Sequence, residues 1–264
     1  MELNVGQKAA YICVYDEPMQ VNAYAQPFTS ADGDVGVLFC HGFTGSPWSM
    51  LEWAKTTAAA GYRVSLPRLP GHGTSWKEMN TTGWRDWYAC VDREFRTLRE
   101  SCHRVFVTGL SMGGALALRL AEKHADDVAG LVLVNPAVQA FPNSWFAPLL
   151  QWFVPSVSAI GSDIAMPGVD EHGYDRTPLK ATASMLSMWT DVRACLDLVT
   201  CPVLVFRSAT DHVVPAASTR TILAHVSSDD ITEHVLTRSY HVATMDYDKQ
   251  TIFDESLEFF AKHR

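Results

Sequence analysis

The sequence predicts a mostly parallel β-sheet flanked by helices. Two observations support this fold class: short runs of Val, Leu and Phe recur along the 264 residues, and segments with helical periodicity lie between them. Continuous apolar runs are typical of strands whose two faces are both buried, as in parallel sheets. Their alternation with helices is typical of α/β domains.

The individual elements follow from these runs and from the residues that interrupt them. Gly61 ends the first expected helix, and Pro67 ends the second expected strand. Residues 83–100 carry large apolar side chains three or four positions apart, which predicts a helix. The first thirty or so residues leave room for an antiparallel hairpin. The expected strands are 35–40, 63–66, 105–108, 131–134, 203–206 and 233–236, and the expected helices are 49–60, 83–100, 115–123, 218–225 and 250–262.

One segment is too long for a simple connection between strands. Residues 135–202 separate two expected strands, whereas a single helical crossover needs far fewer residues. We therefore predict a small cap insertion at 137–188 on a single core domain formed by 1–136 and 189–264. The alternative is a connector buried against the core. The apolar residues expected to line an acyl pocket under this cap are Phe141, Trp145, Phe146 and Leu149.

Composition excludes several classes of function. The formal net charge of -8 argues against a nucleic-acid partner, because nucleic-acid binding needs a basic face. The six Cys are scattered without C-x-x-C pairs, so neither a zinc site nor a disulfide framework is expected. The chain starts without a basic, apolar leader and contains no long apolar run, which predicts a cytoplasmic protein.

Ser111 is the candidate nucleophile. It lies in the sequence Gly-Leu-Ser-Met-Gly at 109–113, after the expected strand 105–108 and before the expected helix 115–123. This strand-turn-helix context is that of a nucleophile elbow, in which glycines permit a tight turn that exposes the serine hydroxyl. The alternative is an ordinary serine in a glycine-rich turn.

A serine hydroxyl needs a base, and the base needs an acid to orient it. In this architecture the chain order is serine, acid, histidine. Asp211 follows the expected strand 203–206, and His241 follows the last expected strand, so both should reach the same sheet edge as Ser111. Residues ranked lower for these roles are Asp246, Asp248, His212, His225, His234 and His263.

Acyl transfer also needs donors for the oxyanion that develops on the substrate. The N–H of Met112, directly after the nucleophile, and the N–H of Phe43, in the loop after the first parallel strand, are the candidates. His41 and His72 lie in loops at the same edge. We expect them to be structural, because the catalytic base follows the acid along the chain.

Five short motifs occur in order along the chain: HGFTG at 41–45, PGHG at 70–73, GLSMGG at 109–114, DHVVP at 211–215 and SYHVA at 239–243. Together they resemble the α/β-hydrolase superfamily and, more narrowly, the bacterial carboxylesterases and thermostable monoacylglycerol lipases. The resemblance covers the chain from about residue 27 to its end. It implies an α/β-hydrolase fold, a triad of Ser111, Asp211 and His241, and oxyanion amides at Phe43 and Met112.

The resemblance also extends to the short cap of that family, around Ile160 and Glu171. In monoacylglycerol lipases a cap acid can bind the glycerol hydroxyls, so the resemblance implies this role for Glu171 and a substrate contact for Ile160. The alternative for Glu171 is a solvated surface charge. The aromatic run at 141–154 departs from the pattern expected of close members, which leaves the acyl-chain preference open.

These observations predict a serine hydrolase that cleaves carboxylic esters, in the first place monoacylglycerols, without a metal or organic cofactor. One alternative is a general carboxylesterase with no preference for glycerol esters. Another is a non-catalytic protein of the same fold that binds a hydrophobic ligand. The expected partner is a small lipid or ester substrate, and the cap is expected to contact lipid surfaces transiently or to form a homodimer interface.

Overall fold

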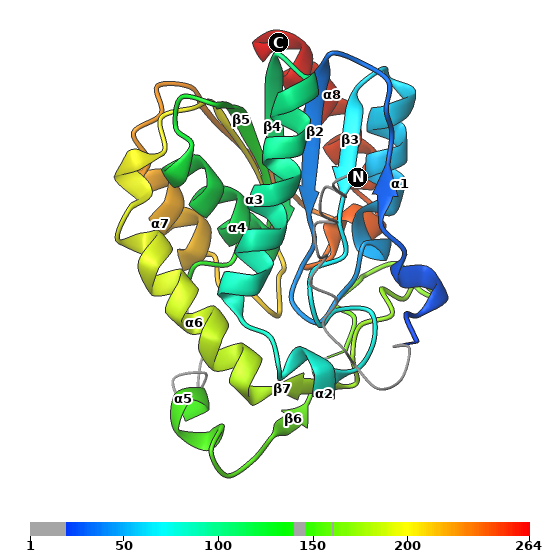
Figure 1. The fold of residues 1–264 in the computed structure, drawn as a ribbon, viewed down its shortest axis with the longest axis vertical. Helices are drawn as coiled ribbons and strands as arrows, with labels where there is room; N and C mark the ends of the chain where they lie inside the picture. The colour runs from blue at the N-terminus through cyan, green and yellow to red at the C-terminus, as the bar shows by residue number, and fades with distance from the viewer. Residues whose placement is uncertain (1–19, 140–145, 160) are drawn as a thin grey trace, which may run out of the picture.

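The structure is a computed structural model that describes residues 20–139, 146–159 and 161–264. In this part of the chain, seven strands form one sheet in the order β1-β3-β2-β4-β5-β8-β9 (Figure 1). β1 pairs with β3 in antiparallel orientation, and every other neighbouring pair is parallel, so the predicted mostly parallel sheet is confirmed. The strands are β1 (Phe28–Thr29), β2 (Val35–Cys40), β3 (Arg63–Leu66), β4 (Arg104–Leu110), β5 (Val128–Val134), β8 (Val203–Ser208) and β9 (Ile231–Leu236).

Helices cover both faces of this sheet (Figure 1). Those that flank it are α1 (Trp48–Ala59), α3 (Trp84–Ser101), α4 (Met112–Lys123), α6 (Leu179–Arg193), α7 (Ala217–His225) and α8 (Lys249–His263). The expected elements are present with small changes at their ends. α4 starts at Met112, earlier than expected. Gly113 and Gly114 lie in its first turn although glycine disfavours a helix, because close packing there leaves no room for a side chain.

Successive side chains of each buried strand point into two separate apolar clusters. In β2, Leu38 packs with α3, α4 and α6, whereas Val37 and Phe39 pack with α1 and α8. All three side chains are fully buried, as the continuous apolar run predicts. The sheet is therefore a middle layer that holds the carboxyl ends of its parallel strands at one edge.

The predicted insertion contributes smaller elements beyond the end of the sheet (Figure 1). These are α5 (Ala147–Leu150) and an antiparallel pair, β6 (Ser156–Ser158) and β7 (Arg176–Pro178). A short helix of the core, α2 (Trp76–Met79), lies next to β7. α6 continues past the expected boundary at residue 188, because its last turns pack Trp189 and Val192 into the core. Among the described residues, no helix is long and apolar enough to span a bilayer.

Two tryptophans provide a test of this layered core. Trp53, on α1, is completely buried, and we expect Trp53→Ala to lower the free energy of unfolding by about 3–5 kcal/mol, because the cavity cannot refill. Trp152 is 77% exposed, so Trp152→Ala removes the same side chain with a change of about 0.5 kcal/mol or less. Guanidinium unfolding curves of the two variants measure the difference. Equal losses would contradict this placement of the core.

Candidate active site

Ser111 occupies a strained turn between β4 and α4. Its φ is +56°, a left-handed conformation that costs energy for a residue with a side chain, and its N–H donates to the Val134 carbonyl at 3.0 Å. The turn is tight on both sides. A Cβ on Gly113 would lie 1.8 Å from the Cys40 carbonyl oxygen, and one on Gly109 would lie 2.3 Å from the Gly113 carbonyl oxygen. Only glycine fits at these two positions.

Asp211 and His241 are brought together by the ends of β8 and β9. The Oδ2 atom of Asp211 lies 2.8 Å from Nδ1 of His241, and both side chains are more than nine-tenths buried. The other oxygen, Oδ1, accepts the N–H groups of Val213 and Val214 at 2.8 and 2.7 Å. Because an ionised carboxylate only accepts, Nδ1 of His241 carries the proton in this bond, and Nε2 is left for proton exchange.

The pKa values of this pair favour a charged acid beside a basic imidazole. Burial works to raise the pKa of Asp211, but the hydrogen bond and charge of His241 and the two backbone N–H groups outweigh it and lower that pKa. Burial works to lower the pKa of His241, but the bond to Asp211 and the negative charges of Asp211, Glu171 and Asp163 raise it. A raised pKa strengthens His241 as a base.

Asn135 holds the two loops that carry this pair. Its amide nitrogen donates to the His241 carbonyl at 2.7 Å, and its Oδ1 accepts the N–H of Ser208 at 2.7 Å, at the end of β8. Its φ of +44° places the buried amide between the two loops. Sequence reasoning did not identify Asn135. The available signal was an Asn, a residue that tolerates left-handed geometry, directly after a buried strand.

The two predicted oxyanion donors come from the turn that carries Ser111 and from a loop next to it. Met112 begins α4, and Phe43 lies in the loop after β2. Among the described residues, no acceptor pairs with the N–H of either residue. Thr44 has a φ of +60°, and its carbonyl accepts the N–H of Tyr174 at 3.2 Å, which ties this loop to the insertion.

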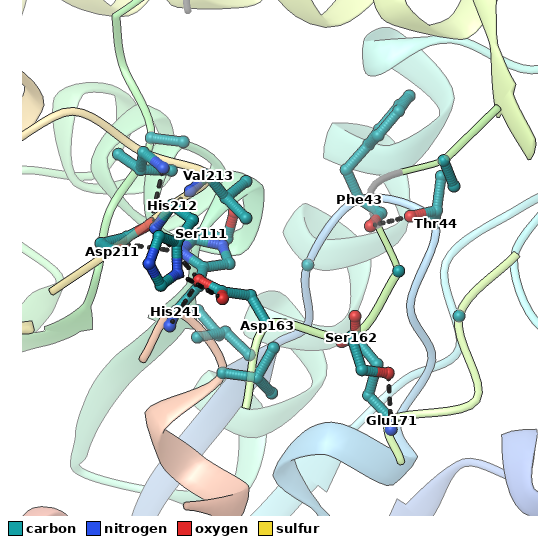
Figure 2. A pocket seen from close by; sticks show the side chains of 18 of the residues that line it. Phe43, Thr44, Ser111, Ser162, Asp163, Glu171, Asp211, His212, Val213 and His241 are labelled. Atoms are coloured by element: carbon teal, nitrogen blue, oxygen red, sulfur yellow. Dashed lines mark hydrogen bonds and ion pairs between the residues drawn. The ribbon is translucent and has the colours of Figure 1, made fainter. Parts of the chain in front are cut away.

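A cavity of about 930 Å³ opens over these residues. Ser111, Asp211 and His241 line one side of it, and Phe43 and Glu171 line another (Figure 2). Burial raises the pKa of Glu171 to about 7, while the charge of His241 opposes that rise. The cavity thus combines apolar walls with a carboxyl group placed away from the serine.

Two of the apolar residues expected to contact the substrate from the cap are described by the structure. Phe146 and Leu149 are 39% and 63% exposed, and neither lines the cavity. The expectation for these two is therefore corrected: α5 lies at the outer end of the insertion, and these side chains face outward. Described apolar residues that do line the cavity include Met185, Trp189, Val213, Val214 and Val242. Phe141, Trp145 and Ile160 lie outside the described residues.

The two histidines expected to be structural join backbone segments. Nε2 of His41 accepts the N–H of Leu69 at 3.1 Å, and its Nδ1 lies 3.0 Å from the Gly42 carbonyl. Burial lowers the pKa of His41 to about 4 and lowers that of His72 well below its usual value. Both rings are therefore neutral and are held in place by backbone groups.

The lower-ranked acids and histidines have other contacts. Asp246 accepts four backbone N–H groups, including those of Ala165 and Met166 in the insertion, and Asp248 binds Arg238 and Ser239. Histidines that do not line the cavity are His225, His234 and His263. Within residues 20–139, 146–159 and 161–264, no three His, Cys, Asp or Glu side chains gather as a metal site requires.

Comparison with known proteins agrees with this geometry. Residues 33–248 match the model of a hydrolase family described as "Serine aminopeptidase, S33". The chain belongs to this serine aminopeptidase S33 family. The sequence is 43% identical to that of a thermostable monoacylglycerol lipase of Bacillus sp. strain H-257, over 94% of this chain and 98% of that protein. It is 26% identical to a carboxylesterase of Bacillus subtilis, over 90% and 96% of the two chains.

Solved structures agree as well. A structure from a study of two metagenome-derived lipolytic enzymes, LipS and LipT, is 39% identical, with a TM-score of 0.90, and the match covers 92% of this chain and all of that one. The monoacylglycerol lipase of Paleococcus ferrophilus has the same fold at 19% identity, with a TM-score of 0.78 over 90% and 99% of the two chains. The α/β-hydrolase fold expected from the motifs is confirmed.

The acid limb of the pH–rate profile tests the pairing of His241 with Asp211. A base must be neutral to act, so the rate of ester hydrolysis falls as the pH drops through the raised pKa of His241. We expect half-maximal kcat/KM above the ordinary histidine value of about 6.5. Asp211→Asn removes the carboxylate, so it moves this midpoint to lower pH and lowers the plateau about 10³–10⁴-fold. A plateau within tenfold of wild type would contradict the pairing.

Proposed function

We propose that this protein is a serine hydrolase that cleaves carboxylic esters through an acyl-enzyme. The observation that carries the proposal is the buried His241–Asp211 hydrogen bond in the same cavity as Ser111 on its strained turn. Ser111 Oγ attacks the ester carbonyl carbon and gives its proton to Nε2 of His241. Asp211 holds the imidazole in the required tautomer and stabilises the imidazolium that forms.

The remaining steps use the same residues. The N–H groups of Phe43 and Met112 stabilise the oxyanion of the tetrahedral intermediate, a contribution of about 2.7–4 kcal/mol for one such donor. The imidazolium of His241 then protonates the leaving alkoxide, which departs as the alcohol. Water attacks the acyl-enzyme with His241 again as base, which releases the carboxylic acid and restores the Ser111 hydroxyl.

The preferred substrate in this proposal is a monoacylglycerol. Two observations support it: the 43% identity to a thermostable monoacylglycerol lipase over nearly the whole chain, and a carboxyl group, Glu171, in the wall of the cavity. Glu171 accepts hydrogen bonds from the glycerol hydroxyls, while the apolar wall takes the acyl chain at about 0.8 kcal/mol per buried methylene. The segment at 137–188 acts as the cap that closes the cavity.

A general carboxylesterase is the second candidate, favoured by the similarity to the Bacillus subtilis carboxylesterase. In that case Glu171 lines the cavity without contacting the substrate. A protein that only binds a hydrophobic ligand is disfavoured, because ligand binding alone does not need the hydrogen-bonded pair of His241 and Asp211.

Paired substrates separate these candidates. We expect a higher kcat/KM for a monoacylglycerol than for the methyl ester of the same fatty acid, across a series of chain lengths. Glu171→Gln should lower kcat/KM for the monoacylglycerol about 10-fold or more, because hydrogen bonds to a charged group contribute about 1.5–3 kcal/mol. The methyl ester serves as control and should change little on the plateau of the pH–rate profile, above the midpoint set by His241. No preference for glycerol esters in wild type would leave the carboxylesterase.

The outer surface of the insertion carries a group of exposed apolar side chains, here called the cap surface. Its members are Phe146, Leu149, Leu150, Trp152, Phe153, Val154 and Val157. Exposed apolar patches of this kind mark interaction sites, and Trp is favoured at lipid–water interfaces. We propose that the cap surface contacts the lipid aggregates that supply the substrate. A homodimer interface is the other use such a surface could have.

Vesicle binding tests this role. Burial of one aromatic side chain in lipid contributes about 1.5–3 kcal/mol, so the double variant Trp152→Ala/Phe153→Ala should bind neutral phosphatidylcholine vesicles at least tenfold more weakly than wild type. Hydrolysis of a water-soluble short-chain ester should not change. The homodimer would be supported instead of the lipid contact by three results together. Wild type forms a concentration-dependent dimer in sedimentation, the double variant abolishes that dimer, and vesicle binding does not change.

A further inference from the structure

Asp163, in the insertion, contacts both loops that carry the acid and the base. Its Oδ2 accepts the N–H of His241 at 3.2 Å and the N–H of His212 at 3.1 Å. Its Oδ1 lies 2.7 Å from Nδ1 of His212, and its main-chain carbonyl accepts the N–H of Val242 at 3.1 Å. Figure 2 shows this carboxylate between the two loops. One side chain from the insertion therefore links residues next to Asp211 with His241 itself.

The carboxylate is built into this place. Its side chain is only 10% exposed, so these polar contacts replace most of its hydration. The main chain of His241 is then held on both sides, with its N–H bound by Asp163 and its carbonyl bound by Asn135. Two anchors on one residue restrict the imidazole to the position in which it meets Asp211.

We propose that Asp163 is a positioning residue for the acid–base pair. It holds the His241 loop and the Asp211 loop in register through its contacts with the main chain of His241 and with His212. Without its carboxylate, both loops lose this anchor. The inference rests on the proposed function and extends it to a residue that does not touch the substrate's reacting atoms.

The chemistry of the contacts allows charge and geometry to be separated. In Asp163→Asn, the amide oxygen can accept the same two backbone N–H groups, and the amide nitrogen can donate to Nδ1 of His212 in the tautomer that leaves this nitrogen without a proton. This variant keeps the contacts but removes the negative charge. Asp163→Ala removes both. Asp191→Asn, on α6 outside the cavity, is the matched control for loss of one carboxylate.

The charged groups that face His241 determine its pKa and therefore the pH at which the rate falls. They are Asp211 on the β8 loop, Asp163 and Glu171 on the insertion, with Asp163 also paired to His212. Since each carboxylate favours the imidazolium, removing the charge of Asp163 lowers the pKa of His241, and the acid limb moves to lower pH. Glu171 titrates at about pH 7, so the comparison is repeated in a Glu171→Gln background.

The test is the second-order rate of inactivation by a fluorophosphonate between pH 5 and 9. In this reaction Ser111 Oγ bonds to phosphorus, fluoride leaves, and His241 takes the proton, so the rate reports the pair without an ester substrate. We expect Asp163→Ala to lower the plateau about 10- to 100-fold, since small misplacements of catalytic groups cost this much. Asp163→Asn should keep the plateau within about threefold and move the midpoint down by about 0.5–1 pH unit. Asp191→Asn should match wild type.

Two results would overturn the proposal: a plateau for Asp163→Ala within twofold of wild type, or a midpoint for Asp163→Asn that does not move. Circular dichroism and thermal unfolding check that the variants fold. If Asp163→Ala does not fold, the midpoint of Asp163→Asn still tests the proposal. Failure of wild type to react at all would instead contradict the proposed function, which is a separate outcome.

Discussion

The hydrogen bond between Asp211 and His241 is the interaction on which the rest of the site depends. It joins two loops that are thirty positions apart, and it forms because β8 and β9 are parallel neighbours whose carboxyl ends meet at one edge. Burial alone would raise the pKa of the acid and lower that of the base. The bond and the opposite charges of the two groups contribute most to reversing both effects, with help from the N–H groups of Val213 and Val214 on the acid and from other carboxylates on the base.

Ser111, the proposed nucleophile, depends on a second constraint of a different kind. At the Ser111 turn, the constraint is steric. Two glycines let β2, β4 and the start of α4 approach more closely than any side chain would permit. That close approach also places Met112 at the helix N-terminus and the Phe43 loop nearby. A rigid packed layer under the sheet edge thus supports a strained turn, which is how folded proteins retain unfavourable backbone geometry at functional sites.

Parts of this arrangement were predictable from sequence because their signals are local. The glycines around Ser111 and the apolar strands leading to Asp211 and His241 are short patterns with direct structural meaning. The outward position of Phe146 and Leu149 was not predictable, because an apolar side chain does not reveal which surface it faces. Asn135 and Asp163 were missed for another reason: most of their partners are backbone groups 73–106 and 49–79 positions away, respectively, and the type of a residue does not predict such distant backbone contacts.

The insertion is therefore more than a cover over an independent core. Asp163 and Asp246 bind it to the loop of His241, and Tyr174 binds it to the loops after β2 and β3. Ser111 is the proposed nucleophile, activated by this supported pair. Mass spectrometric mapping of a fluorophosphonate adduct tests this role. We expect one modified residue, Ser111, with modification lost in His241→Ala. An adduct on another serine, or equal labelling of His241→Ala, would contradict it.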